Sequence, residues 1–139
     1  MINYIDSLET ISPQMLSGFF EGWPKKPSPS RHYEILSNSA EIVLAVDFEN
    51  RRVVGFINAI SDGILSAYIP LLEVLPEYRG NGIGLNLVKK MMAKLSDLYM
   101  VDLVCDRELE KFYGLIGFKL YHAMIYRNFK RQDGSRPDE

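Results

Sequence analysis

A glycine-rich turn between an apolar run and an amphipathic helix constrains the fold of this chain more than any other feature. Residues 71–78 read LLEVLPEY, and residues 79–84 follow directly as RGNGIG. Glycine allows positive φ angles, so several backbone N–H groups can converge on one point at the positive end of a helix dipole. Phosphate and pyrophosphate bind such a turn, and Arg79 adds a guanidinium that can pair with the same anion. The sequence therefore predicts an anion-binding loop at residues 79–84.

Two common phosphate-binding motifs do not fit this loop. A Walker loop requires Lys and then Ser or Thr after its last glycine, whereas Gly84 is followed by Leu85 and Asn86. A dinucleotide fingerprint requires Gly-x-Gly-x-x-Gly, whereas a single residue separates Gly82 from Gly84. A phosphate-binding α/β protein of another type stays open as an alternative, and it would bind ATP or NAD in preference to CoA.

The loop does match Arg/Gln-x-x-Gly-x-Gly/Ala, the acyl-CoA pyrophosphate loop of the GNAT N-acetyltransferases. Residues 74–76, Val-Leu-Pro, resemble the strand end that precedes this loop in the family, and residues 113–118 carry the downstream motif Tyr-x-x-x-Gly-Phe. With two motifs in the family's order, the chain resembles a GNAT enzyme over most of its length, least so before Glu41. The resemblance implies an α/β (α+β mixed-sheet) fold. Its sheet would be predominantly antiparallel, with a central splayed parallel strand pair and flanking helices.

Length and composition fit one soluble domain. With 139 residues, of which 47% are hydrophobic, we expect a single domain over residues 1–139, with about 130–139 as a frayed tail. The net charge of −2 argues against nucleic acid as a partner, and one cysteine excludes an internal disulfide and suits a reducing compartment. The N-terminus lacks the features of a signal peptide, and no apolar run approaches the ~20 residues that span a bilayer. These observations predict a cytoplasmic protein with no membrane partner.

Hydrophobic periodicity predicts alternating strands and helices. Strands are expected at residues 2–5, 41–46, 52–60, 65–75, 100–105 (as a buried strand), 118–121 and 124–129. Helices are expected from Ser12-Pro13, from Ser30 as a cap through about Leu36, over 83–95, and over 109–116 with Gly117 at its end. The first helix would bury Met15, Leu16, Phe19 and Phe20, and the third would bury Ile83, Leu87, Met91 and Leu95. Asp62-Gly63 predicts a hairpin turn.

The resemblance implies transfer of an acetyl group from acetyl-CoA, as co-substrate, to a primary amine by direct attack in a ternary complex, without a metal. An alkylamine has a pKa near ~10, so a group or a water chain must take its proton. The oxyanion on the thioester also needs a preorganised donor, which family members supply from the strand before the loop. The implied acetyl-CoA-binding residues are Leu72, Val74, Leu75, Arg79, Gly80, Asn81, Gly82, Ile83 and Gly84.

Two residues are predicted to be catalytic. Tyr113 matches the tyrosine of the family motif and would donate a proton to the departing CoA thiolate; its alternative role is that of a core side chain. Glu73 stands in an otherwise apolar strand, which indicates a paired or functional carboxylate, so it is the candidate base. The alternatives for Glu73 are a solvated or ion-paired side chain, with a water chain carrying the proton. Asp106 stands where the family often has Asn. Asp can cap the following helix as Asn does, but it has no side-chain amide to donate to CoA.

Other reactive residues are weaker candidates for a catalytic role. Cys105 as a nucleophile with His32 or His122 as base is an alternative, but we expect Cys105 to be a small buried side chain. Cysteine and histidine show no metal-ligand spacing. Trp23 either walls the acceptor pocket or packs under its own loop. The expected acceptor is a small-molecule amine or a peptide amine, and a homodimer is left open. A non-catalytic acyl-CoA-binding or sensor module on the same fold is the alternative to an enzyme.

Overall fold

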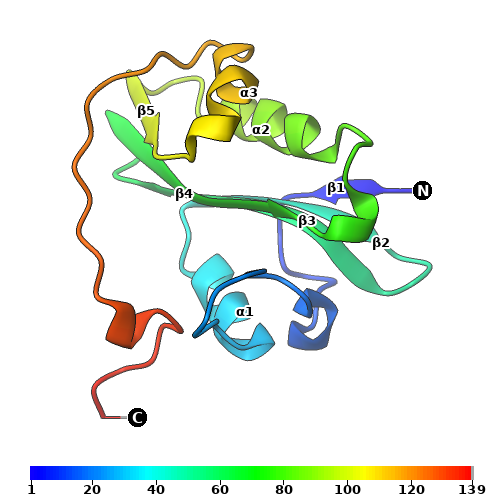
Figure 1. Ribbon diagram of the computed structural model, residues 1–139. Helices are drawn as coiled ribbons and strands as arrows, with labels where there is room; N and C mark the ends of the chain where they lie inside the picture. The colour runs from blue at the N-terminus through cyan, green and yellow to red at the C-terminus, as the bar shows by residue number, and fades with distance from the viewer. Residues whose placement is uncertain (139) are drawn as a thin grey trace.

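The computed structural model of the protein describes residues 1–138 and contains a five-stranded sheet with short helices (Figure 1). The strands are β1 (Asn3–Ile5), β2 (Glu41–Asp47), β3 (Arg52–Ser61), β4 (Ser66–Val74) and β5 (Met100–Leu103). The α-helices are α1 (Pro29–Ser37), α2 (Ile83–Lys94) and α3 (Glu110–Gly114). Single 3-10 turns are η1 (Pro13–Leu16), η2 (Pro76–Tyr78), η3 (Arg107–Leu109) and η4 (Phe129–Arg131). No helix within residues 1–138 is long and apolar enough to cross a membrane.

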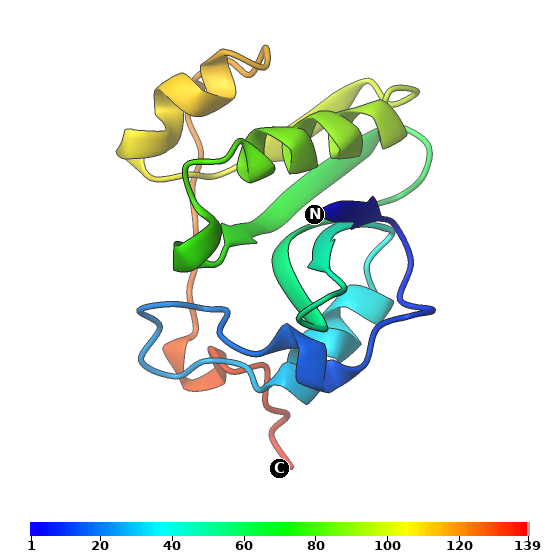
Figure 2. The same ribbon diagram turned by 90° about the vertical axis from the view of Figure 1, so that its right-hand side faces the viewer.

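The sheet has the strand order β1-β2-β3-β4-β5, antiparallel from β1 to β4 and parallel between β4 and β5. Helices α2 and α3 cover one face, and α1 with η1 covers the other (Figures 1 and 2). This arrangement confirms the predicted mixed α/β fold with a parallel strand pair. The parallel pair lies at an edge of the described sheet and not at its centre, because no strand follows β5.

Helix α2 packs directly on the middle of the sheet, as its four-residue periodicity predicts. Its apolar positions are buried: Ile83, Leu87, Met91 and the following Leu95. The close approach depends on Gly55 of β3, because a Cβ there would lie 3.1 Å from Leu87 Cδ1 and 3.2 Å from Ile83 Cγ2. The predicted hairpin between β3 and β4 also forms. Its turn is held by the Asp62 carboxylate, which accepts the backbone N–H groups of residues 64–66, and these bonds lower the Asp62 pKa to about 2.

The predicted helix from Ser12-Pro13 is wrong in length, since only one 3-10 turn forms. Ser17 is extended, and Gly18 and Phe20 both have positive φ angles (94° and 64°), so the backbone leaves the helical region. The predicted apolar set is nevertheless buried: Met15, Leu16, Phe19 and Phe20. The predicted cap of α1 is shifted by two residues. Arg31 N donates to Ser28 Oγ at 3.1 Å, and Pro29 occupies the first helical position.

The predicted strands at 118–121 and 124–129 are wrong, because neither segment pairs with the sheet. The buried strand predicted at 100–105 is also wrong in two respects. It ends at Leu103, and Met100 is 38% exposed, since no strand within residues 1–138 pairs with the outer side of β5. Alternating apolar residues indicate a capacity to pair, but they do not identify the partner.

Residues of η4 and of the segment after it contact the loop before α1. Lys25 N donates to Gln132 Oε1 at 3.0 Å, and Lys25 Nζ donates to the Lys130 carbonyl at 2.5 Å. Asp133 lies 3.8 Å from the same Nζ atom. The frayed tail and the single domain stay predictions, and residue 139 of that tail lies outside the described residues.

The core beneath β3 contains a buried histidine among aromatic rings. His32 is 1% exposed, and its ring centroid lies 4.3 Å from that of Phe56, 4.9 Å from Phe20 and 5.4 Å from Phe19. Neither ring nitrogen has a hydrogen-bond partner within residues 1–138. Desolvation by burial therefore lowers the His32 pKa from 6.5 to about 4.

This histidine is expected to make the protein less stable as pH falls from 6.5 to 4. In that range His32 is neutral in the folded state and protonated in the unfolded chain, so the unfolded state binds more protons. The loss reaches about 3 kcal/mol at pH 4. Urea unfolding of the wild type, His32→Phe and His122→Phe across this range checks it. His32→Phe should flatten the pH slope, whereas His122→Phe, which changes an exposed histidine, should keep it; equal slopes for all three proteins would contradict the expectation.

Candidate active site

The cleft of interest opens where β4 and β5 diverge at the sheet edge. Their pairing ends at Ile69 and Leu103, whereas β4 continues to Val74 beside β3. The next residue, Pro70, has no N–H to continue the ladder. The resulting cleft has a volume of about 300 Å³. It is lined by Phe20, Trp23, Phe56, Ile69, Pro70, Leu71, Leu72, Glu73, Leu103, Val104, Cys105, Asp106, Leu109, Tyr113, Ile125 and Arg127.

Backbone N–H groups of β4 point into this opening. Leu75 N donates to the Val54 carbonyl at 2.8 Å, which makes residues 54 and 75 a hydrogen-bonded pair of the antiparallel ladder. Because such pairs alternate, Leu72 and Val74 direct their N–H groups away from β3 and toward the gap. The Leu75 N–H group is thus used within the sheet, whereas the N–H groups of Leu72 and Val74 have no strand partner on the side of β5.

The glycine-rich loop has the geometry of an anion cradle. Gly80 and Gly82 have φ angles of 83° and 78°, and a Cβ on either would meet no atom within 4 Å, so the space above the loop is open. Within residues 1–138, the backbone N–H groups of residues 80–84 donate no hydrogen bond. Helix α2 begins at Ile83 and adds its dipole. A Cβ at Gly84 would lie 3.8 Å from Val74 Cγ2 and from Phe112 Cζ, so the loop adjoins β4 and α3.

The Arg79 side chain ties the loop to neighbouring elements. Its Nε donates to the Val74 carbonyl at 2.9 Å, and its Nη2 lies 2.8 Å from Glu21 Oε2. The guanidinium is half exposed, so solvent screens this ion pair. The pairing of Arg79 with pyrophosphate stays a prediction. A bound pyrophosphate would have to compete with the Glu21 carboxylate for the guanidinium.

Tyr113 contributes a phenol to the cleft from α3. The residue is 7% exposed, and its ring makes edge contacts with Phe112 and Phe118 at centroid distances of 4.9 and 5.8 Å. Its hydroxyl makes no hydrogen bond within residues 1–138. Desolvation, with a smaller effect of Cys105, raises the Tyr113 pKa to about 12. The phenol is therefore protonated at neutral pH, as a proton donor must be.

Glu73 lines the cleft and also anchors the loop after η1. Its Oε1 accepts the Phe20 N–H at 2.8 Å, and its Oε2 accepts the Glu21 N–H at 3.2 Å. These bonds stabilise the positive φ angle of Phe20, which costs a non-glycine residue about 1–2 kcal/mol. Glu73 pairs with Phe56 across the sheet, so both side chains project from the face that carries α1. Both carboxylate oxygens of Glu73 accept a hydrogen bond. Any role of Glu73 as a base is therefore in addition to its role in anchoring this loop.

Three aromatic side chains form a wall of the cleft that sequence reasoning largely missed. Trp23 lines the cleft, and its ring lies 4.9 Å from that of Phe20, which itself lies 6.2 Å from Phe56. Of the three, only Trp23 is predicted from the sequence as a pocket wall, as one of its two alternatives. The other two are predicted as core or strand residues, and one signal could have found Phe56: it stands opposite the unusual Glu73 once the β3–β4 register is known.

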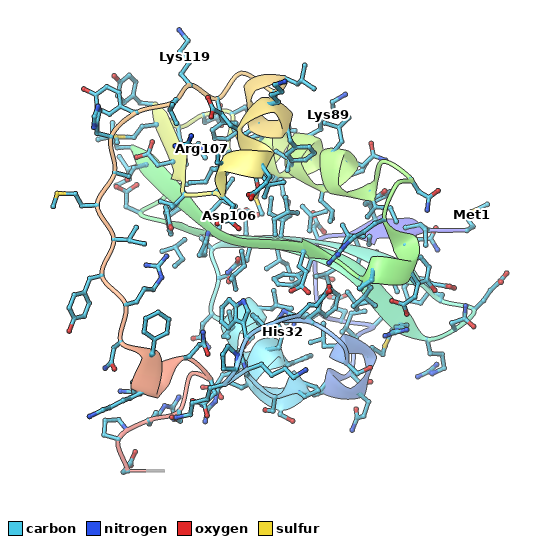
Figure 3. All side chains as sticks on the ribbon, viewed as in Figure 1. Met1, His32, Lys89, Asp106, Arg107 and Lys119 are labelled. Atoms are coloured by element: carbon cyan, nitrogen blue, oxygen red, sulfur yellow. The ribbon has the colours of Figure 1, made fainter. Side chains whose placement is uncertain are left out.

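Cys105 is exposed, so the expectation of a buried side chain is wrong; the strand ends two residues before it. Desolvation, followed by the carboxylates of Asp106 and Glu110, raises the pKa of its thiol, which disfavours the thiolate that a nucleophile needs. His32 lies on the opposite side of the sheet from Asp106, the neighbour of Cys105 (Figure 3). Asp106 precedes η3 without a capping bond from its side chain. No group of potential metal ligands occurs among residues 1–138.

Residues 8–118 match the model of the Acetyltransferase (GNAT) family. This match covers most of the sequence, and the chain therefore belongs to the GNAT family. It is 29% identical to the soybean (Glycine max) protein named Probable acetyltransferase TAP2, over 71% of this chain and 44% of that protein. It is also 29% identical to the soybean Histone acetyltransferase TAP1, over 70% of this chain and 47% of that protein. The chain thus spans less than half the length of either relative.

Solved structures agree with this assignment. A crystal structure of a protein from Deinococcus radiodurans R1, assigned as an acetyltransferase, has a TM-score of 0.94 and 44% identity and covers 97% of this chain and 94% of its own. A GNAT family protein from Streptococcus pneumoniae TIGR4 has a TM-score of 0.75 and 29% identity, over 92% and 98% of the two chains. Both likenesses extend over nearly the whole of this chain.

Proposed function

We propose that this chain transfers an acetyl group from acetyl-CoA to a primary amine by direct attack in a ternary complex. The observation that carries the proposal is the cleft between β4 and β5. It is lined by residues of both faces of the sheet, so a donor on the α3 side can meet an acceptor on the α1 side. The family membership of residues 8–118 supports the same chemistry.

The residues of the donor side fit acetyl-CoA. The open loop at 80–84 offers unpaired N–H groups at a helix N-terminus, which suits a pyrophosphate. Leu72 and Val74 direct N–H groups into the gap, where they would stabilise negative charge on a carbonyl oxygen. Acetyl-CoA supplies an activated acyl group as a thioester. Tyr113, protonated and free of other hydrogen bonds, is the proposed proton donor to the leaving sulfur.

The acceptor side is suited to a cationic amine. Phe20, Trp23 and Phe56 present aromatic rings to the cleft, and Glu73, which lines the same cleft, presents a carboxylate. Ammonium groups bind aromatic faces and carboxylates. Glu73, directly or through water, would then take the proton that the amine must lose. The acceptor can be a small molecule or a peptide, since the cleft opens to solvent; nucleic acid is not part of the proposal.

An exposed free thiol is consistent with a reducing compartment. Cys105 is exposed and unpaired among residues 1–138. We therefore include a cytoplasmic location in the proposal.

Thiol release in an amine panel tests the proposed function. Purified protein with acetyl-CoA and amino acids, polyamines, aminoglycosides or peptides should release CoA only when a suitable amine is present, and the amine should gain an acetyl group by mass spectrometry. Tight acetyl-CoA binding without turnover on any amine would instead support a non-catalytic acyl-CoA sensor. Preference for ATP or NAD over CoA would contradict both.

A further inference from the structure

Arg127 brings a positive charge to a cleft whose other charged side chains are acidic. Among the lining residues, all of which belong to the described residues 1–138, it is the one basic side chain, and the acidic ones are Glu73 and Asp106. Its Nη1 donates to the carbonyl of the preceding Tyr126 at 3.3 Å, and the guanidinium makes no other hydrogen bond and no ion pair within residues 1–138. Most of the five N–H donors of the guanidinium are therefore available to a ligand.

Contacts between distant parts of the chain hold the segment that carries Arg127. This segment leaves α3 on one face of the sheet and reaches η4 on the face that carries α1 (Figures 1 and 2). Shortly after Arg127, the Lys130 carbonyl accepts a bond from Lys25 Nζ at 2.5 Å, and Gln132 Oε1 accepts one from Lys25 N at 3.0 Å. Lys25 belongs to the same loop as Trp23, which lines the cleft. These contacts indicate that Arg127 lies on the acceptor side of the cleft.

Arg127 and Glu73 place opposite charges in one cleft without neutralising each other. No ion pair joins the two side chains within residues 1–138, so the carboxylate oxygens and the guanidinium nitrogens lie more than 4 Å apart. A site with two separated and opposite charges is complementary to a molecule that carries both an ammonium and an anionic group. The cleft volume of about 300 Å³ is at the lower end of the range for small-molecule sites. A small zwitterion therefore fits both the charges and the size.

We propose, on the basis of the acetyl transfer proposed above, that the acceptor is a free amino acid or a similar small amine that carries a carboxylate. Its ammonium faces Glu73 and the aromatic rings, and its carboxylate pairs with Arg127. A guanidinium matches a carboxylate in a bidentate geometry, which a single point charge does not provide. Arg127 is thus a residue that determines the specificity for the acceptor.

The charges of the cleft disfavour other classes of amine. In a polyamine or an aminoglycoside, a second ammonium would meet the Arg127 guanidinium. A phosphorylated amine would bring up to about two negative charges to a cleft that already holds the carboxylates of Glu73 and Asp106. A peptide N-terminus has an amide where an amino acid has its carboxylate, so it would leave Arg127 without an anion. A zwitterion gives Glu73 and Arg127 each a partner of opposite sign and adds no net charge.

Acetyl transfer to such an acceptor keeps the chemistry proposed above. The amine nitrogen forms a bond to the acetyl carbon as the C–S bond breaks. Of the two protons that the ammonium loses, one passes through Glu73 or water to solvent, and the other balances the proton that Tyr113 gives to the sulfur. The carboxylate of the acceptor stays bound throughout, so its contact with Arg127 stabilises the ground state and the transition state alike. Such a contact lowers the KM for the acceptor and leaves kcat nearly unchanged.

Matched pairs of acceptors test the proposal on the full chain. Free amino acids with the amine α, β or γ to the carboxylate are each compared with their carboxamides, which keep the size and lose the charge. Because an amide also changes the reactivity of the amine, the wild type and Arg127→Gln are compared on both members of each pair. Arg127→Gln should lower kcat/KM for the amino acid about tenfold, the lower end for a hydrogen bond to a charged group, because Arg127 is exposed. The loss should lie in the KM for the amine, and kcat/KM for the carboxamide should change little.

Two further variants are controls. Arg127→Lys keeps the charge without the planar fork, so it should retain part of the preference for the amino acid. Lys119→Gln removes a charge of the same sign from the same segment, at a side chain that does not line the cleft and points away from the sheet (Figure 3). It should act on both members of each pair as the wild type does. Arg127→Gln should also melt as the wild type does, because the exposed side chain bonds only to a neighbouring carbonyl.

Three results would overturn the proposal while leaving acetyl transfer intact. The first is that a polyamine, an aminoglycoside, a phosphorylated amine or a peptide is acetylated with a higher kcat/KM than any free amino acid. The second is an equal loss for the amino acid and its carboxamide in Arg127→Gln. The third is a loss confined to the KM for acetyl-CoA, which would assign Arg127 to the donor.

Calorimetric binding separates this proposal from the proposed function if no amine is acetylated. Titration of the same amino acids and carboxamides into the protein with CoA measures the acceptor site without turnover. Binding that requires the carboxylate and weakens about tenfold in Arg127→Gln would support the Arg127 site and reject acetyl transfer. The absence of any carboxylate-dependent binding, together with the absence of turnover, would reject both.

Discussion

Tyr113→Phe is expected to lower turnover by about 10²–10⁴-fold, the usual contribution of general acid catalysis. The substitution removes the hydroxyl alone, and the ring keeps its contacts with Phe112 and Phe118. Acetyl-CoA affinity should change little, because neither the loop at 80–84 nor the N–H groups of β4 are touched. Steady-state kinetics on an amine for which chemistry limits the rate gives the measurement.

Two controls separate catalysis from stability in this variant. The Tyr113 hydroxyl makes no hydrogen bond within residues 1–138, so the melting temperature should be nearly that of the wild type. The loss of turnover should also shrink for an acyl donor with a more acidic thiol, whose thiolate departs with less help. Full activity of Tyr113→Phe would refute the acid role, and a much lower melting temperature would assign the hydroxyl to structure.

Gly82→Asp is expected to weaken acetyl-CoA binding by at least ~100-fold. The substitution places a carboxylate in the anion loop, where it repels a pyrophosphate and competes for the same N–H groups. Loss of two hydrogen bonds to a charged group, at about 1.5 kcal/mol or more each, accounts for this factor. Isothermal titration calorimetry gives the dissociation constant.

Gly82→Asn is the matched control for this charge. Asparagine has the size of aspartate and tolerates the left-handed conformation, which Gly82 adopts at φ 78°. No atom lies within 4 Å of an added Cβ, so both variants should fold. The Asn variant should bind acetyl-CoA more tightly than the Asp variant. Equal dissociation constants for the wild type and Gly82→Asp would show that the pyrophosphate does not bind to this loop.

The elements that the sequence predicts well depend on local signals. Strands β2, β3 and β4 follow from apolar runs bounded by polar turns, and the Asp62-Gly63 turn joins two of them. Helix α2 follows from its four-residue apolar repeat. Only the family resemblance predicts the diverging parallel strand pair. No local sequence pattern in β4 or β5 indicates that the two strands are parallel.

The features that the sequence does not predict have a different cause. They depend on contacts between distant parts of the chain. The positive φ angle of Phe20 is held by Glu73, 53 residues away, and no local pattern predicts that bond. The aromatic wall of the cleft arises in the same way, from side chains of separate elements. Residues 118–129 have strand-forming composition, yet none of them pairs with the sheet in the part of the chain that the structure describes, because alternating apolar residues do not specify the edge with which they pair.

A crystal structure with acetyl-CoA tests the central claim most directly, because the claim is about where the thioester lies. We predict that the pyrophosphate contacts the backbone N–H groups of residues 80–84 at about 3 Å. The thioester carbonyl should face the N–H groups of Leu72 or Val74, and the sulfur should lie within reach of the Tyr113 hydroxyl. Acetyl-CoA bound outside the gap between β4 and β5, with the Tyr113 hydroxyl remote from its sulfur, would contradict the account.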